Sequence, residues 1–235
     1  MNRCGTLMRG CLIVTDERTD RRLVGQFLRD NRQAIDLLSS RRSETGFAVA
    51  VERLFGLNPS RGKIVRIANG RYGYHSSQKQ LVSFLPEAWI NAFEQRESPW
   101  PGCRKWWAGY PLMTWIEILA GDDRFSAYLR LNAEVGPLAP QQARSRLINM
   151  ISIGAAQNGL SGIRFAANAG DTGQLYSRFL QRNRLGIADH ANIAELEAGI
   201  IRLLQAFEPE FKMIGAVLGS VNTGNTDSSA ISGDE

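Results

Sequence analysis

Long apolar runs are missing from this 235-residue chain. No apolar run approaches the roughly 18 to 20 residues that a membrane-spanning helix needs, so we expect no membrane insertion. The segment MNRCGTLMRGCLIVTDERTD contains arginines but only a four-residue apolar run, CLIV, so we expect no cleaved secretory signal. The sequence therefore predicts a cytoplasmic protein.

Cysteine and histidine are also scarce. The three cysteines, Cys4, Cys11 and Cys103, cannot all pair and show no C-x-x-C spacing, which is typical of reduced thiols in an intracellular protein. The two histidines, His75 and His190, are far apart, and neither has a Cys or another His nearby in the sequence. We therefore expect no metal site.

Motifs that carry chemistry are absent too. The chain has no GxxxxGK[ST], GxGxxG or GxSxG, and no Cys with a suitably placed His. Its Glu-x-Lys match, Glu210-Phe211-Lys212, follows Pro209 in a helical context, whereas a metal-dependent nuclease needs such groups on a strand beside a second acidic residue. We interpret the match as incidental. The sequence thus assigns no catalytic residue and predicts no bound cofactor.

Four of the five tryptophans lie in residues 96–140, before and within two short apolar runs, MTWIEIL and FSAYLRLNAEV. The segment 120–124, AGDDR, has the Gly and Asp residues of a turn, so the two runs predict a β-hairpin. In the second run, alternation predicts two faces: Phe125, Ala127, Leu129, Leu131 and Ala133 on one, and Ser126, Tyr128, Arg130, Asn132 and Glu134 on the other.

Acidic side chains in this hairpin allow a second interpretation. Glu117 and Glu134 can face each other across the two strands, with Asp122 and Asp123 at the tip. Paired carboxylates can bind a metal ion. Acidic residues at a hairpin rim more often serve solubility, and we favour that interpretation.

Other patterns complete a fold of class α+β (mixed α/β), with a central, mostly antiparallel sheet covered by helices. Asn69-Gly70 predicts a turn between two strands. Helical spacing in 141–157 places Arg144 and Arg146 near the polar side. The predicted strands cover 10–15, 63–67, 71–75, 80–85 and 160–167; the predicted helices begin near Thr19 and cover 43–55, 86–93, 141–157 and 192–207. We expect a basic helical lobe in 1–60, the main α/β domain in 61–218 and a disordered tail in 219–235.

Charge is unevenly distributed along the chain. Residues 1–80 hold 15 Lys and Arg against 7 Asp and Glu, whereas residues 81–235 hold 13 against 16. A basic face of this kind can attract nucleic acid, an anionic membrane surface or an acidic protein partner, and the alternative is an arginine-rich helix that is merely solvated. The predicted binding residues are Arg21, Arg22, Arg29, Arg32, Lys63, Arg66, Arg71, Tyr72, Tyr74, Trp106 and Trp107.

Each aromatic residue in this set allows two interpretations, a binding role and a structural one. Tyr72 and Tyr74 beside cations on a predicted ribbon are typical of surfaces on which single-stranded nucleic acid stacks, and equally of a generic surface. Trp106 and Trp107 lie after Pro101 and Gly102, so we expect them on a loop. Their rings can stack on bases or line a ligand pocket; we favour packing between sheet and helix, because aromatic rings bury large areas.

Several segments together suggest a family. FLPEAW, WPGCRKWWAGYPLMTWIEI, LRLNAEVGPL, YSRFLQRNR and FEPEF, with QFLRDNRQAIDLL upstream, resemble the C-terminal portion of PD-(D/E)XK nuclease superfamily proteins of bacterial defence. The Pro-Asp and the strand-borne Glu-x-Lys of that family are missing here. The resemblance therefore implies a non-catalytic accessory or target-binding domain in a defence or mobile-element setting.

A second resemblance is to GNAT acyltransferases. LNAEVGPLAPQQARSRLINMI, GLSGIRFAA and LYSRFL follow the order strand, helix, strand, helix. Segment 142–146, QARSR, lacks the two glycines with which those enzymes bind the pyrophosphate of coenzyme A.

We thus predict a non-catalytic binding or regulatory module that contacts nucleic acid or an acidic protein partner and can form a homodimer. The alternatives are a degenerate acyltransferase, a metal-dependent nuclease, and an inhibitor that acts through protein–protein contact.

Overall fold

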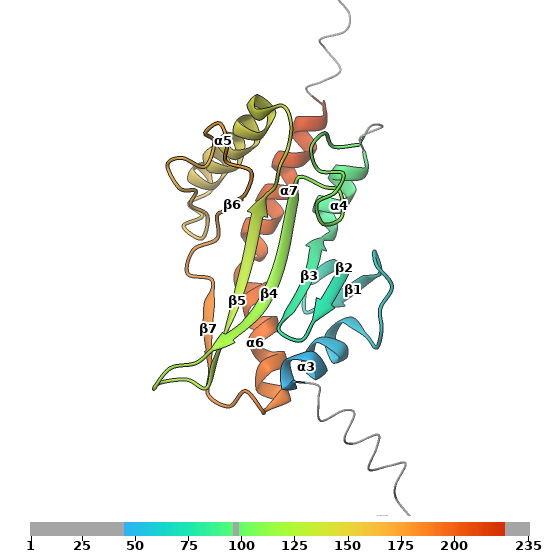
Figure 1. Ribbon diagram of the computed structural model, residues 1–235, viewed down its shortest axis with the longest axis vertical. Coiled ribbons are helices and arrows are strands. Elements are labelled where there is room, and N and C mark those ends of the chain that lie inside the picture. Colours follow the sequence, from blue (N-terminus) through green and yellow to red (C-terminus); the bar gives the residue numbers. More distant parts are fainter. Residues whose placement is uncertain (1–44, 96–98, 224–235) are drawn as a thin grey trace, which may run out of the picture. The chain divides into compact units, whose positions relative to one another are not determined.

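The structure, a computed structural model, describes residues 45–95 and 99–223 (Figure 1). All of these residues belong to one unit, Glu44–Glu235. The described elements are, in order, α3 (Gly46–Phe55), β1 (Ile64–Ile67), β2 (Gly70–Gln78), β3 (Leu81–Pro86), α4 (Glu87–Glu94), β4 (Leu112–Ala120), β5 (Ala127–Val135), α5 (Gln141–Gln157), β6 (Ser177–Arg178), β7 (Arg184–Ile187), α6 (Ile193–Ala206) and α7 (Glu208–Thr223).

The strands form one antiparallel sheet. Their order is β1-β2-β3-β4-β5-β6, and β7 also pairs with β5. The predicted α+β class with a central antiparallel sheet is therefore confirmed. Of the predicted basic lobe in 1–60, the structure describes α3 and the loop that follows it; the rest, including the predicted strand 10–15 and the helix from Thr19, lies outside the described residues.

The β4–β5 hairpin is the longest pairing of the sheet and has the predicted alternation. Its register runs without a break from Leu112 opposite Val135 to Ala120 opposite Ala127. Ala127, Leu129, Leu131 and Ala133 are at most 3% exposed and form the inner face. Phe125 differs from the prediction: its ring lies over Gly186 and against Tyr128 on the outer face, because regular pairing begins only at Ala127.

Helices cover the inner face of the sheet. Figure 1 shows α6 and α7 behind β4 and β5. Phe55 of α3 lies 5.7 Å from Phe84 of β3, and Phe211 of α7 packs edge-on against Tyr72 of β2. Asn192 begins α6 as its cap, since its side chain accepts a hydrogen bond from the Glu195 amide at 3.2 Å. The core thus lies between the sheet and these helices.

Part of the outer face is covered as well. Ile90 of α4 lies over Gly73 of β2, and Phe93 of α4 stacks on Tyr110 at 4.9 Å. Tyr110 belongs to the tryptophan loop, by which we mean residues 99–111 between α4 and β4. α4 and the tryptophan loop therefore cover the outer face near the end of β3. They do not cover the part of the β4–β5 hairpin that lies near its turn.

Several local predictions can be compared with the fold. The predicted helices 43–55, 86–93, 141–157 and 192–207 are present as α3, α4, α5 and α6. The predicted turn is shifted by one residue: the loop is Ala68-Asn69, with φ +52° at Ala68, and Gly70 already pairs with Ile67. The predicted strand 160–167 is wrong, because that segment makes only an isolated bridge between Ile163 and Leu180.

At the C-terminal end of the described residues, α7 continues to Thr223, which lies within the segment 219–235 that we predicted as a disordered tail. Among the helices that the structure describes, none combines the length and the apolar composition that crossing a bilayer requires.

Candidate functional site

Outward-facing side chains on β4, β5, β6 and β7 gather on the outer face of the sheet, where the tryptophan loop reaches only one end of them. Cross-strand pairing puts Trp115 beside Asn132, Glu117 beside Arg130, and Glu134 beside Arg178. In Figure 1 the hairpin lies in front of α6 and α7. We call this surface the hairpin face; it consists of Trp115, Glu117, Tyr128, Arg130, Asn132, Glu134, Arg178 and Arg184.

The tryptophan end of the hairpin face is built around Trp115. Trp107 of the tryptophan loop stacks on the Trp115 ring, with centroids 6.0 Å apart and planes 18° apart. The Arg178 guanidinium lies 4.9 Å from the same ring. Trp115 is buried, whereas the Arg178 side chain is 57% exposed. A cation held over an aromatic ring loses less freedom when it binds an anion, so an exposed Arg178 in this position can contact an anionic ligand.

In the middle of the hairpin face, three polar side chains, Glu117, Arg130 and Asn132, are hydrogen-bonded to one another. Glu117 Oε1 accepts hydrogen bonds from Arg130 Nε and Asn132 Nδ2, both at 2.8 Å, and lies 2.7 Å from Arg130 Nη2. These short, charge-assisted contacts leave Arg130 engaged with Glu117.

The far end repeats the pairing of cation and ring. The Arg184 guanidinium lies 4.2 Å from the centroid of Tyr128. The Tyr128 hydroxyl donates to Asp122 Oδ2 at 2.5 Å, which raises the pKa of the phenol and lowers the pKa of the carboxyl. At the tip, Arg124 lies 5.5 Å from the ring of Phe125. The hairpin face thus carries cation–aromatic pairs at both ends.

A histidine cluster adjoins the tryptophan loop on β2 and β3. His75 Nδ1 lies 3.2 Å from the hydroxyls of Ser76 and Ser83, which are 2.8 Å from each other. The His75 ring packs edge-on against Trp107 at 5.7 Å. Burial, and then the charge of Arg61, lower the pKa of His75, while the backbone of Trp107 opposes that shift.

This cluster is not arranged as a nucleophilic site. A hydroxyl beside an imidazole is the pair that activates a serine, but the base must also be oriented by a third group. His75 Nε2 is buried and has no hydrogen-bond partner among the described residues, and Ser83 is fully buried. The His75 ring contacts Trp107 and thereby holds the tryptophan loop against β2.

The predicted cations divide into two groups. Arg21, Arg22, Arg29 and Arg32 lie outside the described residues. Lys63, Arg66 and Arg71 are exposed on or beside β1 and β2, with Arg66 directly opposite Arg71. Arg71 forms an ion pair with Glu87 of α4 at 3.0 Å. β3 lies between β2, which carries Arg71, and the β4–β5 hairpin, and Lys63 and Arg66 are one strand further away.

The predicted stacking role of Tyr72 and Tyr74 requires a correction. Both rings point into the core and are 2% and 8% exposed. Tyr72 packs edge-on against Phe84 at 5.4 Å, and burial together with the charge of Glu208 raises its pKa to about 12. These rings cannot stack on a base in this fold, because period-two alternation turns them toward the helices.

Trp106 and Trp107 lie on a loop, as predicted, and both are half-buried. Trp106 covers Gly136 and lies 6.1 Å from Tyr176, which is 50% exposed. The favoured interpretation, that the tryptophans pack between sheet and helix, agrees with these contacts. Their exposed parts border the hairpin face.

Sequence reasoning missed Arg178 and Arg184 as site residues. Alternation in residues 126–134 had already grouped Tyr128, Arg130, Asn132 and Glu134 on one face. What it could not supply was the position of β6 and β7 beside β5, since strands of two and four residues give almost no periodic signal.

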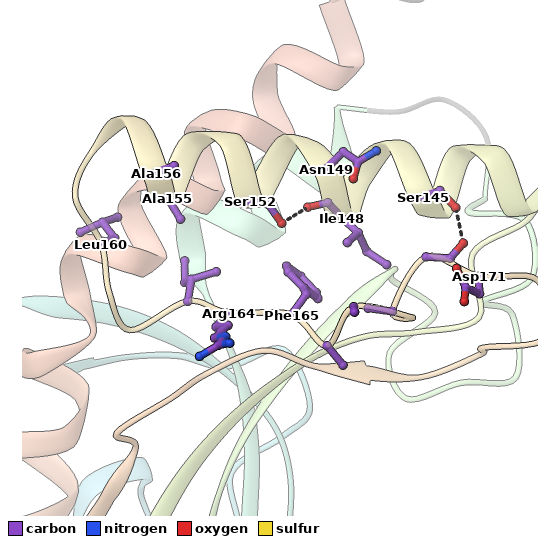
Figure 2. Close-up of a pocket in the computed structure, with 15 residues that line it drawn as sticks. Ser145, Ile148, Asn149, Ser152, Ala155, Ala156, Leu160, Arg164, Phe165 and Asp171 are labelled. Carbon is purple, nitrogen blue, oxygen red and sulfur yellow. Dashed lines mark hydrogen bonds between the residues drawn. The ribbon is translucent and has the colours of Figure 1, made fainter.

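A second candidate is the cleft beneath α5, which has a volume of about 610 Å³ (Figure 2). Ile148, Ala155 and Phe165 contribute to its walls, and Figure 2 shows Phe165 pointing toward the helix while Arg164 points away. The hydroxyls of Ser145 and Ser152 already donate to backbone carbonyls, at 2.7 and 2.8 Å. The polar side chains of Asn149, Arg164 and Asp171 also line the cleft, so its walls are mixed in character.

The remaining groups considered for chemistry do not converge. Glu117 and Glu134 each pair with an arginine and not with each other. Glu210 is buried near Gly162, whereas Lys212 is exposed and pairs with Glu208 at 2.7 Å. Burial raises the pKa of the Cys103 thiol to about 11. Within residues 45–95 and 99–223, no three His, Cys, Asp or Glu side chains gather as a metal site.

Comparison with protein families, with curated proteins and with solved structures finds no match to this chain. The resemblances to PD-(D/E)XK nucleases and to GNAT acyltransferases stay predictions.

Proposed function

We propose that this protein is a non-catalytic binding module that holds single-stranded nucleic acid on its hairpin face. The observation that carries the proposal is the pair of cation–aromatic contacts, Arg178 on Trp115 and Arg184 on Tyr128, on the outer face of one sheet, where both arginines are exposed. Proteins that bind single strands combine cations along the backbone path with flat groups on which bases stack. Guanidinium planes serve for stacking as well as aromatic rings do.

The spacing of the two stacks suits one oligonucleotide. Arg178 is opposite Glu134 and Arg184 is opposite Arg130 on the same strand, β5. Four residues of a strand span about 13 Å. Surfaces of this kind accommodate roughly 4 to 16 nucleotides, so a single oligomer reaches both cations.

Charge supports a polyanionic ligand at these two positions. Arg184 is exposed, and Arg178 is 57% exposed with Nε 3.6 Å from Glu134 Oε2, whereas Arg130 is held by Glu117. Of the three arginines of the hairpin face, Arg178 and Arg184 are therefore the ones available to a ligand. The predicted binding through Lys63, Arg66 and Arg71 remains a separate proposal, because those residues lie at the β1 edge of the sheet.

Fluorescence anisotropy with a labelled twelve-nucleotide poly-dT tests the proposal. Arg178→Gln should weaken binding about tenfold at low salt, since a charge-assisted hydrogen bond contributes about 1.5 kcal/mol. It should also flatten the plot of log K against log salt by about 0.7, the slope per phosphate contact on a single strand.

The matched control is Arg202→Gln, which removes the same charge from an exposed position on α6. Wild-type affinity is expected for this variant. Equal losses in the two variants, or no binding by the wild type at low salt, would contradict the proposal. If the protein does not bind the oligonucleotide but binds an acidic protein, the protein-partner alternative is favoured.

A further inference from the structure

The ion pair between Glu134 and Arg178 is unequal. The two residues face each other across β5 and β6, with Glu134 Oε2 3.6 Å from Arg178 Nε. The glutamate side chain is 12% exposed and the arginine side chain 57%. A separation of 3.6 Å exceeds the usual hydrogen-bond range of about 2.7 to 3.2 Å. The carboxylate is thus largely buried, whereas the guanidinium is exposed and makes only a long contact with it.

The neighbouring pair on the same face is different. Arg130 contacts Glu117 Oε1 through both Nε and Nη2, at 2.8 and 2.7 Å, and Asn132 adds a third contact. Glu117 and Arg130 therefore form a closed unit. Of these two glutamates, Glu134 is the one whose partner can leave it for an external anion.

We propose that Glu134 competes with the ligand for Arg178, so that it acts as an internal brake on anion binding at the hairpin face. This inference rests on the proposed function and adds the residue that regulates it. A phosphate that contacts Arg178 comes close to the Glu134 carboxylate, and the two like charges repel each other across a partly buried space.

Protonation of Glu134 should release the brake. Burial raises the pKa of Glu134, while Arg178 of β6 and Arg144 of α5 lower it. Opposite Glu134 on β4 is Met113, which carries no charge, and along β5 the nearest charged side chain on the same face is Arg130. When a phosphate neutralises Arg178, the carboxylate loses part of its stabilisation and its pKa rises further. Binding therefore takes up protons, and affinity should rise as the pH falls toward that pKa.

The test is poly-dT anisotropy at constant salt from pH 5 to pH 8 with the wild type and Glu134→Gln. Glutamine keeps the size of the side chain and removes its charge. At pH 7.5 we expect the variant to bind about fivefold more tightly, an effect within the range of partly exposed charge pairs. The gain should shrink as the pH approaches 5. Because both proteins contain His75, the difference between their profiles isolates Glu134.

Glu197→Gln on α6 is the matched control, since Glu197 also pairs with an arginine, Arg53 at 3.2 Å, away from the hairpin face. If the wild type binds and Glu134→Gln shows the same affinity and pH profile, the brake is refuted while the proposed function stands. If only Glu134→Gln binds, the competition is supported and binding by the native chain is not. If neither protein binds, both proposals are overturned.

Discussion

Arg144 is the residue at which sequence and structure disagree most. The helical pattern placed it near the polar side of α5, yet it is fully buried. Its guanidinium donates to the carbonyls of Gly136 and Ala169 and to the Ser177 hydroxyl, at 2.9, 2.5 and 2.7 Å. A buried cation is tolerated when every N–H finds an acceptor, and no sequence pattern reveals those acceptors. Arg144 therefore joins α5 to the end of β5 and to β6.

Replacing Arg144 should destabilise the fold strongly. Arg144→Met removes the buried hydrogen bonds that the guanidinium donates to Gly136, Ala169 and Ser177, and we expect a loss of about 3 kcal/mol in the free energy of unfolding. Urea denaturation followed by circular dichroism measures this loss. Arg146→Met, an exposed position on the same helix, should change stability by no more than about 0.5 kcal/mol. Similar values for the two variants would contradict the role of Arg144 as a buried connector.

Among the elements, the tryptophan loop contains two glycines, Gly102 and Gly109, whose different roles cannot be predicted from the sequence. Gly102 and Gly109 have nearly equal backbone angles, with φ +83° and +85°. A Cβ on Gly102 would lie 2.0 Å from the carbonyl oxygen of Pro137, whereas a Cβ on Gly109 would meet nothing within 4 Å. Of these two glycines, only Gly102 combines the left-handed conformation with close backbone contact.

Substituting Gly102 and Gly109 by alanine, one at a time, distinguishes the cost of backbone strain from the cost of a steric clash. Gly109→Ala should cost about 1 kcal/mol, the usual penalty of the left-handed conformation for a residue with a Cβ. Gly102→Ala should cost clearly more and should loosen the contact between Trp107 and Trp115, because the loop must move away from Pro137. Thermal unfolding and near-ultraviolet circular dichroism give the two readouts. Equal effects of the two substitutions would show that the contact with Pro137 is unimportant.

Long elements were predictable from the sequence and short ones were not. The β4–β5 hairpin and α6 have strong period-two and helical patterns over 9 and 14 residues. Segment 160–167 looked like a strand because of its apolar residues, but it crosses under α5 and pairs only at Ile163. Asn69-Gly70 is a strong signal for a turn at those two residues. In the structure Gly70 already pairs with Ile67, so the turn lies one residue earlier, at 68–69.

At the scale of the whole molecule, the sheet separates two roles. Its inner face is the core, and its outer face carries the cation–aromatic pairs that the hairpin brings together with β6 and β7. The sequence predicted the α+β fold and the polar side of the hairpin. It could not predict the site, because Trp115, Tyr128, Arg178 and Arg184 become neighbours only through pairings distant along the chain. Tyr72 and Tyr74, which we predicted as binding residues beside cations on a ribbon, face the core.

The central claim is that the hairpin face is the surface on which nucleic acid lies. Ultraviolet crosslinking of a poly-dT oligonucleotide to the full chain, followed by mass spectrometry of the peptides, tests it most directly. The account predicts crosslinks at Trp107, Tyr128 and Tyr176, and their loss when Arg178 and Arg184 are both replaced by glutamine. Crosslinks confined to α6 and α7, or unchanged crosslinks in the double variant, would contradict it.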